Sequence, residues 1–195
     1  MLNSLADDFN MVQNVFSMVW LRLRKLWYAS FGTYRTPRTF EEKVQQLSTF
    51  EQSEIIDNDR TNHAEIAMIA IYKKAAEKKL PIRHVTGFLD PAVYSSPKLE
   101  EALNGCIKKK VPISMMYTDV DLFEQHNSEF KNSITTYPLA KVVPSNENLP
   151  HMIMLGDNGA VFRYETHPER HTAKLSFNCP EFGSRLVSEF DENFP

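Results

Sequence analysis

Apolar side chains recur every three or four positions between residues 9 and 28, the spacing that places them on one stripe of an α-helix. Gln13, Ser17 and Arg22 are among the polar residues that interrupt this stretch, whereas a membrane-spanning helix needs about 20 mostly apolar residues. The acidic residues also precede the basic ones, which is the reverse of a secretory signal. The pattern therefore predicts an amphipathic helix that neither spans a membrane nor is cleaved.

This amphipathic segment has two interpretations. In the first, its apolar stripe packs against the rest of the chain or against a second copy. In the second, it is an interfacial anchor whose basic side chains face anionic lipid while its tryptophans lie at headgroup depth. We expect the protein to be cytoplasmic, and in this second interpretation it would also be peripheral on the inner membrane. The face that would contact a membrane or a partner consists of Val12, Phe16, Val19, Trp20, Leu23 and Trp27.

A break follows this segment. Gly32 and Pro37 belong to a polar run that predicts a linker at 30–38. The charge changes at the same place, because residues 1–40 carry five basic and two acidic side chains, a local charge of +3, and the remainder carries −6. The sequence is therefore divided into an amphipathic helical segment with its linker, residues 1–38, and a domain, residues 39–195.

Beyond the linker, two capping boxes predict two helices. Thr39 and Glu42 predict a helix from about 40 to 54, and Asn62 with Glu65 predicts a helix that runs to about residue 79. The last half of the second helix is rich in lysine, which suits the negative end of the helix dipole and predicts a solvated face. These lysines are Lys73, Lys74, Lys78 and Lys79.

The pattern after Pro81 predicts a βαβ unit. Residues 82–88 and 111–117 have the composition of strands, and Ser96-Pro97 begins a helix between them. Two strands joined through a helix are expected to be parallel, with a right-handed crossover. Cys106 falls on the inner face of that helix and is expected to be an inert core residue.

The rest of the chain adds two helices and four strands. The residues from Gly156 to Gly159, which read Gly-Asp-Asn-Gly, tolerate positive φ and predict a tight antiparallel hairpin. The fold class is therefore α/β, with a mixed β-sheet covered by helices. The predicted elements are a helix at 119–134, strands at 140–144, 151–155, 160–165 and 172–177, and a helix that begins at Cys179-Pro180.

Composition and motifs exclude several kinds of partner and of functional site. The net charge is −3, from 22 basic and 25 acidic residues, so no global basic field indicates nucleic acid as a partner. Cys106 and Cys179 cannot form a disulfide scaffold or a four-thiolate zinc site, and the six glycines form neither a Walker loop nor a GxGxxG motif. Asp119 and Asp121 either bind Mg²⁺ or cap the next helix, and the cap is favoured. The sequence therefore predicts no cofactor and no metal.

A set of polar residues follows the predicted strands in a particular order. His151 begins a strand, Asp157 lies in the hairpin, Arg163-Tyr-Glu165 ends the next strand, and Phe177-Asn-Cys-Pro-Glu181 precedes the last helix. In this order residues 82–194 resemble one half of the phospholipase D-like superfamily, and more particularly its small bacterial members with a single half. Active members carry His-x-Lys-x4-Asp. There the histidine attacks phosphorus, the lysine binds phosphoryl oxygens, and an asparagine on the following strand helps to hold the phosphate.

The chain departs from this motif at two positions. Ile153 stands where the resemblance places the lysine, and Asp157 follows His151 by six residues instead of seven. Phosphoryl transfer depends on charge neutralisation, so the missing lysine argues against an ordinary phosphodiesterase. The resemblance then implies a non-catalytic module with a regulatory or scaffold role through protein or membrane-surface interaction. The expected partners are a protein or a second copy in a homodimer, and an anionic membrane surface through residues 9–28, but not nucleic acid.

The alternative is a phosphodiesterase or nuclease whose divergent site is completed by dimerisation. His151 would be the nucleophile, and Asn178 would bind the phosphate. Arg163 or Lys174 would replace the missing lysine. Two of these residues also have ordinary structural interpretations, since Arg163 can pair with Glu165 on one sheet face and Asn178 can cap the last helix. The candidates for binding an anion are His151, Arg163, His171 and Asn178.

Overall fold

The computed structural model describes residues 37–145, 147, 149–167 and 172–195. The chain divides between Arg38 and Thr39, and the structure below is that of the unit that begins at Thr39. The helix predicted at 9–28, with its membrane or partner face, lies outside the described residues, and so does His171.

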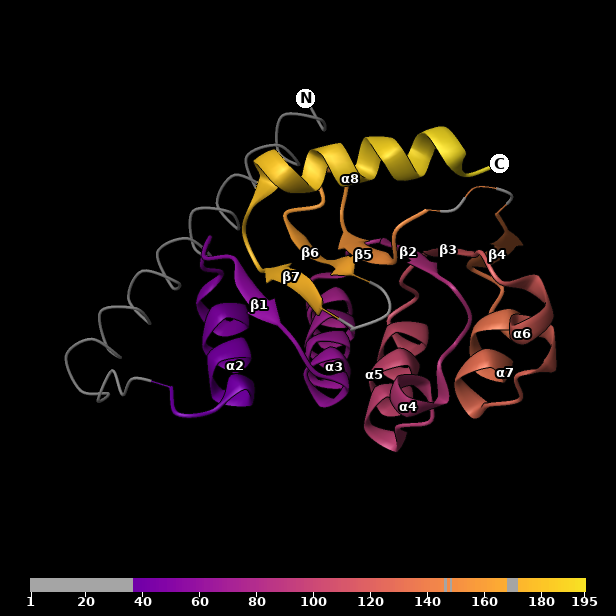
Figure 1. Cartoon of the computed structure of the whole chain (residues 1–195), viewed down its shortest axis with the longest axis horizontal. Helices are drawn as coiled ribbons and strands as arrows, with labels where there is room; N and C mark the ends of the chain where they lie inside the picture. The colour runs from indigo at the N-terminus through magenta and orange to yellow at the C-terminus, as the bar shows by residue number, and fades with distance from the viewer. Residues whose placement is uncertain (1–36, 146, 148, 168–171) are drawn as a thin grey trace, which may run out of the picture. The chain divides into compact units, whose positions relative to one another are not determined.

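Seven strands in the described residues form one mixed sheet (Figure 1). They are β1 (Ile56–Asn58), β2 (Ile82–Thr86), β3 (Ile113–Tyr117), β4 (Ala140–Pro144), β5 (Met152–Leu155), β6 (Val161–His167) and β7 (Thr172–Ser176). Across the sheet their order is β1-β7-β6-β5-β2-β3-β4. β2, β3 and β4 are parallel neighbours, whereas β5 pairs antiparallel with β2 and with β6. The predicted α/β class, the parallel βαβ unit and the hairpin are confirmed.

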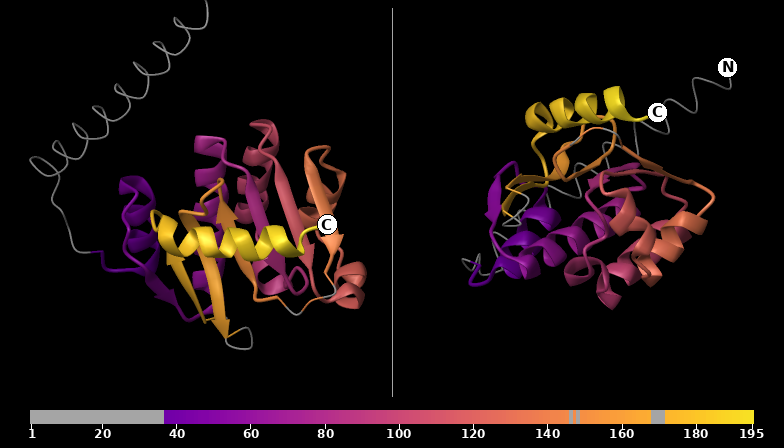
Figure 2. Two further views of the ribbon diagram at one scale, coloured as in Figure 1. Left: turned by 90° about the horizontal axis from the view of Figure 1, so that it is seen from above. Right: turned by 45° about the vertical axis from the view of Figure 1, so that its right-hand side comes forward.

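Helices cover the two faces of the sheet unequally. Of the helices in the described residues, α8 (Pro180–Asn193) lies on one face and the others lie on the opposite face (Figures 1 and 2). None of the described helices is long and apolar enough to cross a membrane. The helices of the second face are α2 (Phe40–Phe50), α3 (Thr61–Lys78), α4 (Pro91–Tyr94), α5 (Pro97–Lys108), α6 (Val120–Gln125) and α7 (Glu129–Thr136).

Alternation along the strands separates two apolar clusters. On β5, Ile153 faces the larger cluster beneath α2 to α7, whereas Met152 and Met154 face the smaller cluster beneath α8. Burying one such side chain stabilises the fold by roughly 1.5–3 kcal/mol. Cys106 has no exposed surface and lies in the larger cluster, as predicted.

Side-chain caps fix several helix starts. The hydroxyls of Thr39 and Ser96 accept hydrogen bonds from the amides of Glu42 (3.1 Å) and Leu99 (3.4 Å). The Asp119 carboxylate accepts one from the amide of Leu122 at 3.0 Å, so the predicted cap is confirmed. These local signals were legible in sequence because a cap needs only residues that are three positions apart.

Four sequence predictions need correction. The region 119–134 contains two helices, because the Ser128 hydroxyl accepts from the amide of Lys131 (3.1 Å) and starts α7 anew. Asn62 does not cap α3, which begins at Thr61, and Glu65 instead accepts a hydrogen bond from the Ser96 hydroxyl at 2.6 Å. The first helix ends at residue 50 instead of 54, and β1 and α4 are unpredicted elements.

The fourth correction concerns Lys74, which was expected on a solvated face. Its side chain is only 4% exposed, with the ammonium 3.5 Å from a Glu51 carboxylate oxygen and 3.2 Å from one of Glu77. Helical periodicity places it beside Ile71 and Ala75 on the buried face of α3. The stem therefore packs in the protein while the ammonium group reaches its carboxylate partners.

Two glycines join the start of α8 to the hairpin between β5 and β6. A Cβ atom on Gly183 would overlap the carbonyl oxygen of Gly159, and one on Gly159 would lie 2.5 Å from the carbonyl oxygen of Gly183. Gly159 also has a φ of 58°, in the left-handed region that favours glycine. The glycine that shapes the turn thus also lets the backbone of α8 approach it closely.

We predict that Gly183→Ala destabilises the protein by about 2 kcal/mol, because the new methyl group forces α8 away from the turn. Urea unfolding followed by circular dichroism measures the change. Ser184→Ala alters the next, exposed position and should change the free energy of unfolding by less than about 0.5 kcal/mol. Equal stability of Gly183→Ala and the wild type would contradict the close contact between α8 and the turn.

Candidate functional site

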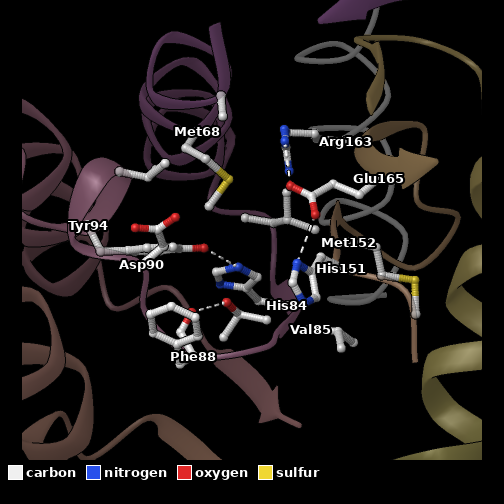
Figure 3. Close-up of a pocket in the computed structure, with 14 residues that line it drawn as sticks. Met68, His84, Val85, Phe88, Asp90, Tyr94, His151, Met152, Arg163 and Glu165 are labelled. Carbon is white, nitrogen blue, oxygen red and sulfur yellow. Dashed lines mark hydrogen bonds and ion pairs between the residues drawn. The ribbon is translucent and has the colours of Figure 1, made fainter. Parts of the chain in front are cut away.

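A pocket of about 130 Å³ opens at the carboxyl end of β2 (Figure 3). β3 lies on one side of β2 and β5 on the other, so the pocket sits where the strand order reverses. In open α/β sheets this is the usual place for a ligand. The polar side chains of its lining are His84, Thr86, Asp90, Tyr94, His151, Arg163 and Glu165.

A chain of hydrogen bonds crosses the floor of the site, from β1 to the start of β5. The Asn58 side-chain oxygen accepts from Nε of Arg163 at 3.1 Å. Nη2 of Arg163 donates to Oε1 of Glu165 at 2.7 Å, and Oε2 of Glu165 lies 2.8 Å from Nδ1 of His151. Both carboxylate oxygens of Glu165 are therefore engaged, one by a guanidinium and one by an imidazole.

The Arg163 and Glu165 side chains are each only 6% exposed, so their charges interact with little screening by water. Burial raises the pKa of Glu165, but the hydrogen bond from His151 and the positive charge of Arg163 outweigh it, so the pKa is lowered overall. The carboxyl group is ionised at neutral pH, and the pair is neutral as a whole. The predicted same-face ion pair of Arg163 with Glu165 is confirmed.

His151 lines the pocket, and its second ring nitrogen, Nε2, is not the one that Glu165 holds. Its side chain is 32% exposed, in contrast to the buried carboxylate that holds Nδ1. A Cβ atom on Gly87 would lie 2.8 Å from Nε2, so the imidazole occupies room that only glycine leaves. The carboxylate orients the ring through Nδ1, as in sites where a carboxylate orients a catalytic histidine.

A second histidine, His84 on β2, is buried beside the first. Its Nε2 lies 2.9 Å from the Tyr94 hydroxyl and its Nδ1 lies 3.3 Å from the Tyr72 hydroxyl. A neutral imidazole has one donor and one acceptor nitrogen, and two hydroxyls can satisfy both. Burial, with the nearby positive groups of His151 and Arg163, lowers the pKa of His84 to about 3. His84 is therefore neutral at physiological pH.

The structure brings together some of the residues singled out in sequence and separates others. His151 and Arg163 belong to one cluster, joined through Glu165. Lys174 instead donates to an Asp57 carboxylate oxygen at 3.1 Å. Tyr164, which lies opposite Lys174 on β6, packs in the cluster under α8. Lys174 thus lies on the opposite sheet face from the pocket.

Asn178 does not cap the last helix, contrary to the structural interpretation given above. Its side-chain amide donates to the backbone carbonyl of Glu51 at 3.0 Å, and α8 starts at Pro180, with Cys179 as an N-cap residue that makes no side-chain cap. The N-cap position of α8 belongs to Cys179, so the Asn178 side chain lies one residue before the position from which a cap accepts the first helical amides.

Sequence reasoning missed three members of the site. Asn58 lies on β1, a strand of three residues, and Tyr94 lies in α4, a helix of four; both are too short to give a periodic signal. His84 lies in the strand predicted at 82–88, next to the apolar Val85. That position was the one sign in the sequence that its side chain is buried. No group of three or more histidine, cysteine or acidic side chains in the described residues is arranged to hold a metal ion.

The fold and site together define an α/β module with a mixed sheet and a pocket centred on histidine. No protein-family model matches the chain, and no curated protein matches its sequence. The finer prediction, a single phospholipase D-like half, stays a prediction.

Two solved structures are similar to this fold. One is TrmBL2, an archaeal chromatin protein described with a novel mode of DNA binding, with a TM-score of 0.50 and 9% identity over 98% of this chain. The match covers 64% of the archaeal chain, and at this identity it shows a shared fold alone. The other is polyphosphate kinase from Porphyromonas gingivalis, at 11% identity over 81% of this chain and 28% of that one. Its TM-score of 0.43 is too low to support any argument.

The archaeal structure corrects the partner prediction, which named a protein, a second copy or an anionic membrane and did not expect nucleic acid. The fold is shared with a chromatin protein described as binding DNA, so the exclusion of nucleic acid does not stand. The physical reason is that a net charge of −3 is a sum over the whole chain, whereas partners respond to local patches of charge.

We predict that His84 makes stability depend on pH. Its pKa is about 3 in the folded state, whereas an unfolded histidine has a pKa near 6.5, so the unfolded chain binds one more proton between these values. The contribution of His84 is complete above pH 6.5 and is lost as the pH falls towards 3. The free energy of unfolding is measured in urea for the wild type and for His84→Gln between pH 5.5 and 4.5. Its slope against pH should be smaller in the variant by about 1 kcal/mol per pH unit.

The control for this measurement is His167→Gln, which removes an exposed histidine from the end of β6. Its slope should match that of the wild type. Identical slopes for all three proteins would mean that His84 is protonated in the folded state and would contradict its neutral environment.

Proposed function

We propose that residues 39–195 form a phospholipase D-like module that works by binding a ligand and not by hydrolysing one. The observation that carries the proposal is the pairing of Arg163 with Glu165 inside the pocket, at 2.7 Å. In this proposal the pocket is the recognition site and the role of the module is regulatory.

Electrostatics support this interpretation. Phosphoryl transfer needs positive charge that is free to stabilise the phosphate oxygens in the transition state. Arg163 is the guanidinium of the pocket, and it donates to Glu165 and to Asn58 at the same time. Asp90 adds a second carboxylate to the lining. A phosphate that entered would meet a neutralised arginine and a further negative charge, which disfavours both binding and catalysis.

The position of the lysine expected from the resemblance supports the same conclusion. Ile153 takes that position, is 1% exposed, and packs in the larger apolar cluster. Arg163 lies directly opposite Ile153 in the pairing of β5 with β6, and it is already paired with Glu165. The cluster thus preserves the shape of a histidine site without its free positive charge.

The size of the pocket limits the ligand. A volume of about 130 Å³ is close to that of an engineered cavity of ~150 Å³ that holds benzene. Phe88 and Val93 give the lining apolar surface, while Nε2 of His151 and the Tyr94 hydroxyl provide hydrogen bonds. We infer that the module recognises a small uncharged polar molecule, or one such group of a larger ligand.

A second candidate function is a phosphodiesterase with His151 as the nucleophile. The contact between His151 and Glu165 at 2.8 Å favours it, because a carboxylate on Nδ1 would orient the ring and stabilise its positive charge after attack. The candidate still needs a cation for the phosphate, which Arg163 would supply only by leaving Glu165.

We predict that the protein shows no phosphodiester hydrolysis that depends on His151. Wild type and His151→Ala are compared on bis(p-nitrophenyl) phosphate, single-stranded DNA and phosphatidylcholine. The expected result is the same background rate for both proteins, since the site lacks free positive charge for the transition state. Turnover that the substitution abolishes would overturn the binding module and establish the second candidate.

We also predict that Glu165→Gln creates a phosphate site, because it releases the charge of Arg163 while keeping the shape of the side chain. Inorganic phosphate should then stabilise the variant against urea, by about 1.4 kcal/mol at ten times the dissociation constant. Glu181→Gln, an exposed change on α8, is the matched control and should respond to phosphate as the wild type does, hardly at all. If phosphate stabilises the wild type as strongly as Glu165→Gln, the neutralisation of Arg163 is refuted.

A further inference from the structure

α3 and α5 have the same kind of C-terminal cap. Lys79 and Lys110 have φ values of 55° and 57°, in the left-handed region. In each case the next amide, of Leu80 or Val111, donates to the carbonyl five residues earlier, at 3.1 and 3.0 Å. These are Schellman ends, in which a left-handed residue and the apolar residue after it close the helix. The sequences Lys-Lys-Leu-Pro-Ile (78–82) and Lys-Lys-Val-Pro-Ile (109–113) carry the repeat.

The fold places both ends at the same edge of the sheet. β2 and β3 are parallel, with Ile82 opposite Ile113, and the amide of Ile82 donates to the carbonyl of Pro112 at 2.9 Å. The two helices approach closely near these ends, because a Cβ on Gly105 would lie 3.8 Å from that of Ala76. Figure 1 shows α3 and α5 on the same face of the sheet. We call Lys79, Lys108, Lys109 and Lys110 the lysine ridge.

The charge of the ridge is not neutralised by ion pairs. Its four side chains are exposed, and none of them forms an ion pair with a carboxylate in the described part of the chain. The neighbouring Lys78 differs, since its ammonium lies 2.8 Å from Glu51. The turn that contains Asp157 reaches the same edge, since its Gly156 amide donates to the carbonyl of Pro81. Four positive charges thus face solvent at this edge.

Ending a helix does not require these lysines. Glycine is the residue that best adopts the left-handed conformation, and a side chain there costs free energy. A lysine also interacts favourably with the helix dipole, but one such charge at each end serves that purpose. The ridge holds lysine at both left-handed positions and adds Lys108 in the last turn of α5 and Lys109 at its C-cap. Folding alone leaves this excess unexplained.

We propose that the lysine ridge binds the phosphate backbone of a nucleic acid, without reading its sequence. Lysine ammonium groups contact phosphates as point charges and carry no base specificity by themselves. An acidic protein partner is the less favoured alternative, because protein interfaces are depleted in lysine and depend on buried apolar anchors. Of the large exposed hydrophobic residues in the described chain, Leu139 lies at this edge, next to Ile113. One leucine beside four lysines favours an electrostatic contact.

The structure offers a variant that removes charge without disturbing the fold. Lys79→Gly with Lys110→Gly places glycine where the backbone already prefers it, so the double variant should unfold at the same or higher urea concentration. The control is Lys98→Gln with Arg185→Gln, which removes the same charge from the start of α5 and from α8. The full chain is used throughout, so residues 1–38 contribute equally to every protein.

Fluorescence anisotropy measures binding to a labelled 30-base-pair DNA duplex and to a single strand of mixed sequence, between 50 and 200 mM salt. Removing two phosphate contacts should weaken binding at least about tenfold and reduce the salt slope by about 2. The control variant should stay within about twofold of the wild type. Binding of either nucleic acid with this difference between variants supports the proposal.

Three results would overturn it. The first is no binding of either nucleic acid by the wild type at 50 mM salt. The second is equal weakening in both double variants, which would make the effect one of net charge. The third is displacement of the duplex by poly-glutamate at equal charge concentration, which would identify an acidic protein as the partner. These substitutions lie outside the pocket. Whether they support or refute nucleic-acid binding by the lysine ridge, the proposal that the pocket binds a ligand is tested separately.

Discussion

The buried ion pair between Arg163 and Glu165 is the interaction on which the site depends. Both side chains point into the space between the sheet and its larger helical layer, where an unpaired charge would be costly. Asn58 satisfies one donor of the guanidinium, and His151 uses the second carboxylate oxygen. The pair therefore does more than neutralise itself, because it fixes a strand at the edge of the sheet and the orientation of a histidine in the middle of it.

That same pair decides what chemistry the pocket favours. Strand alternation and the register between β5 and β6 place Ile153, Arg163 and Glu165 on one face of the sheet. Arg163 therefore brings a positive charge to this place, and Glu165 neutralises it. A histidine oriented by a carboxylate occurs both in catalytic and in purely structural sites. The two kinds of site differ in whether positive charge is free to interact with a substrate. Here Glu165 pairs with the guanidinium of the pocket, which is why we propose recognition of an uncharged group and not hydrolysis.

Most elements of the fold could be predicted because their signals are local. Thr39, Ser96 and Asp119 cap helices through residues three positions away, and Gly156 and Gly159 define a hairpin within four residues. The site could be predicted only in part. Arg163 and Glu165 share a strand, so their pairing follows from periodicity, whereas the contact of Arg163 with Asn58 joins residues 105 positions apart. Tertiary packing, and not any pattern along the chain, brings β1 and α4 to the pocket.

The two ends of β2 and β3 differ in charge, and the net charge of the chain does not show this difference. Their carboxyl ends border a pocket in which the charge of Arg163 is paired with Glu165, while their amino ends follow two helices that finish in lysine. A sum over the chain hides this separation, because the acidic residues that produce a total of −3 lie elsewhere or are paired with other lysines such as Lys74 and Lys78. The field at a surface follows its nearest charges within about 8–10 Å at physiological salt. A protein with more acidic than basic residues can therefore present a basic edge, provided that its fold collects helix ends in one place.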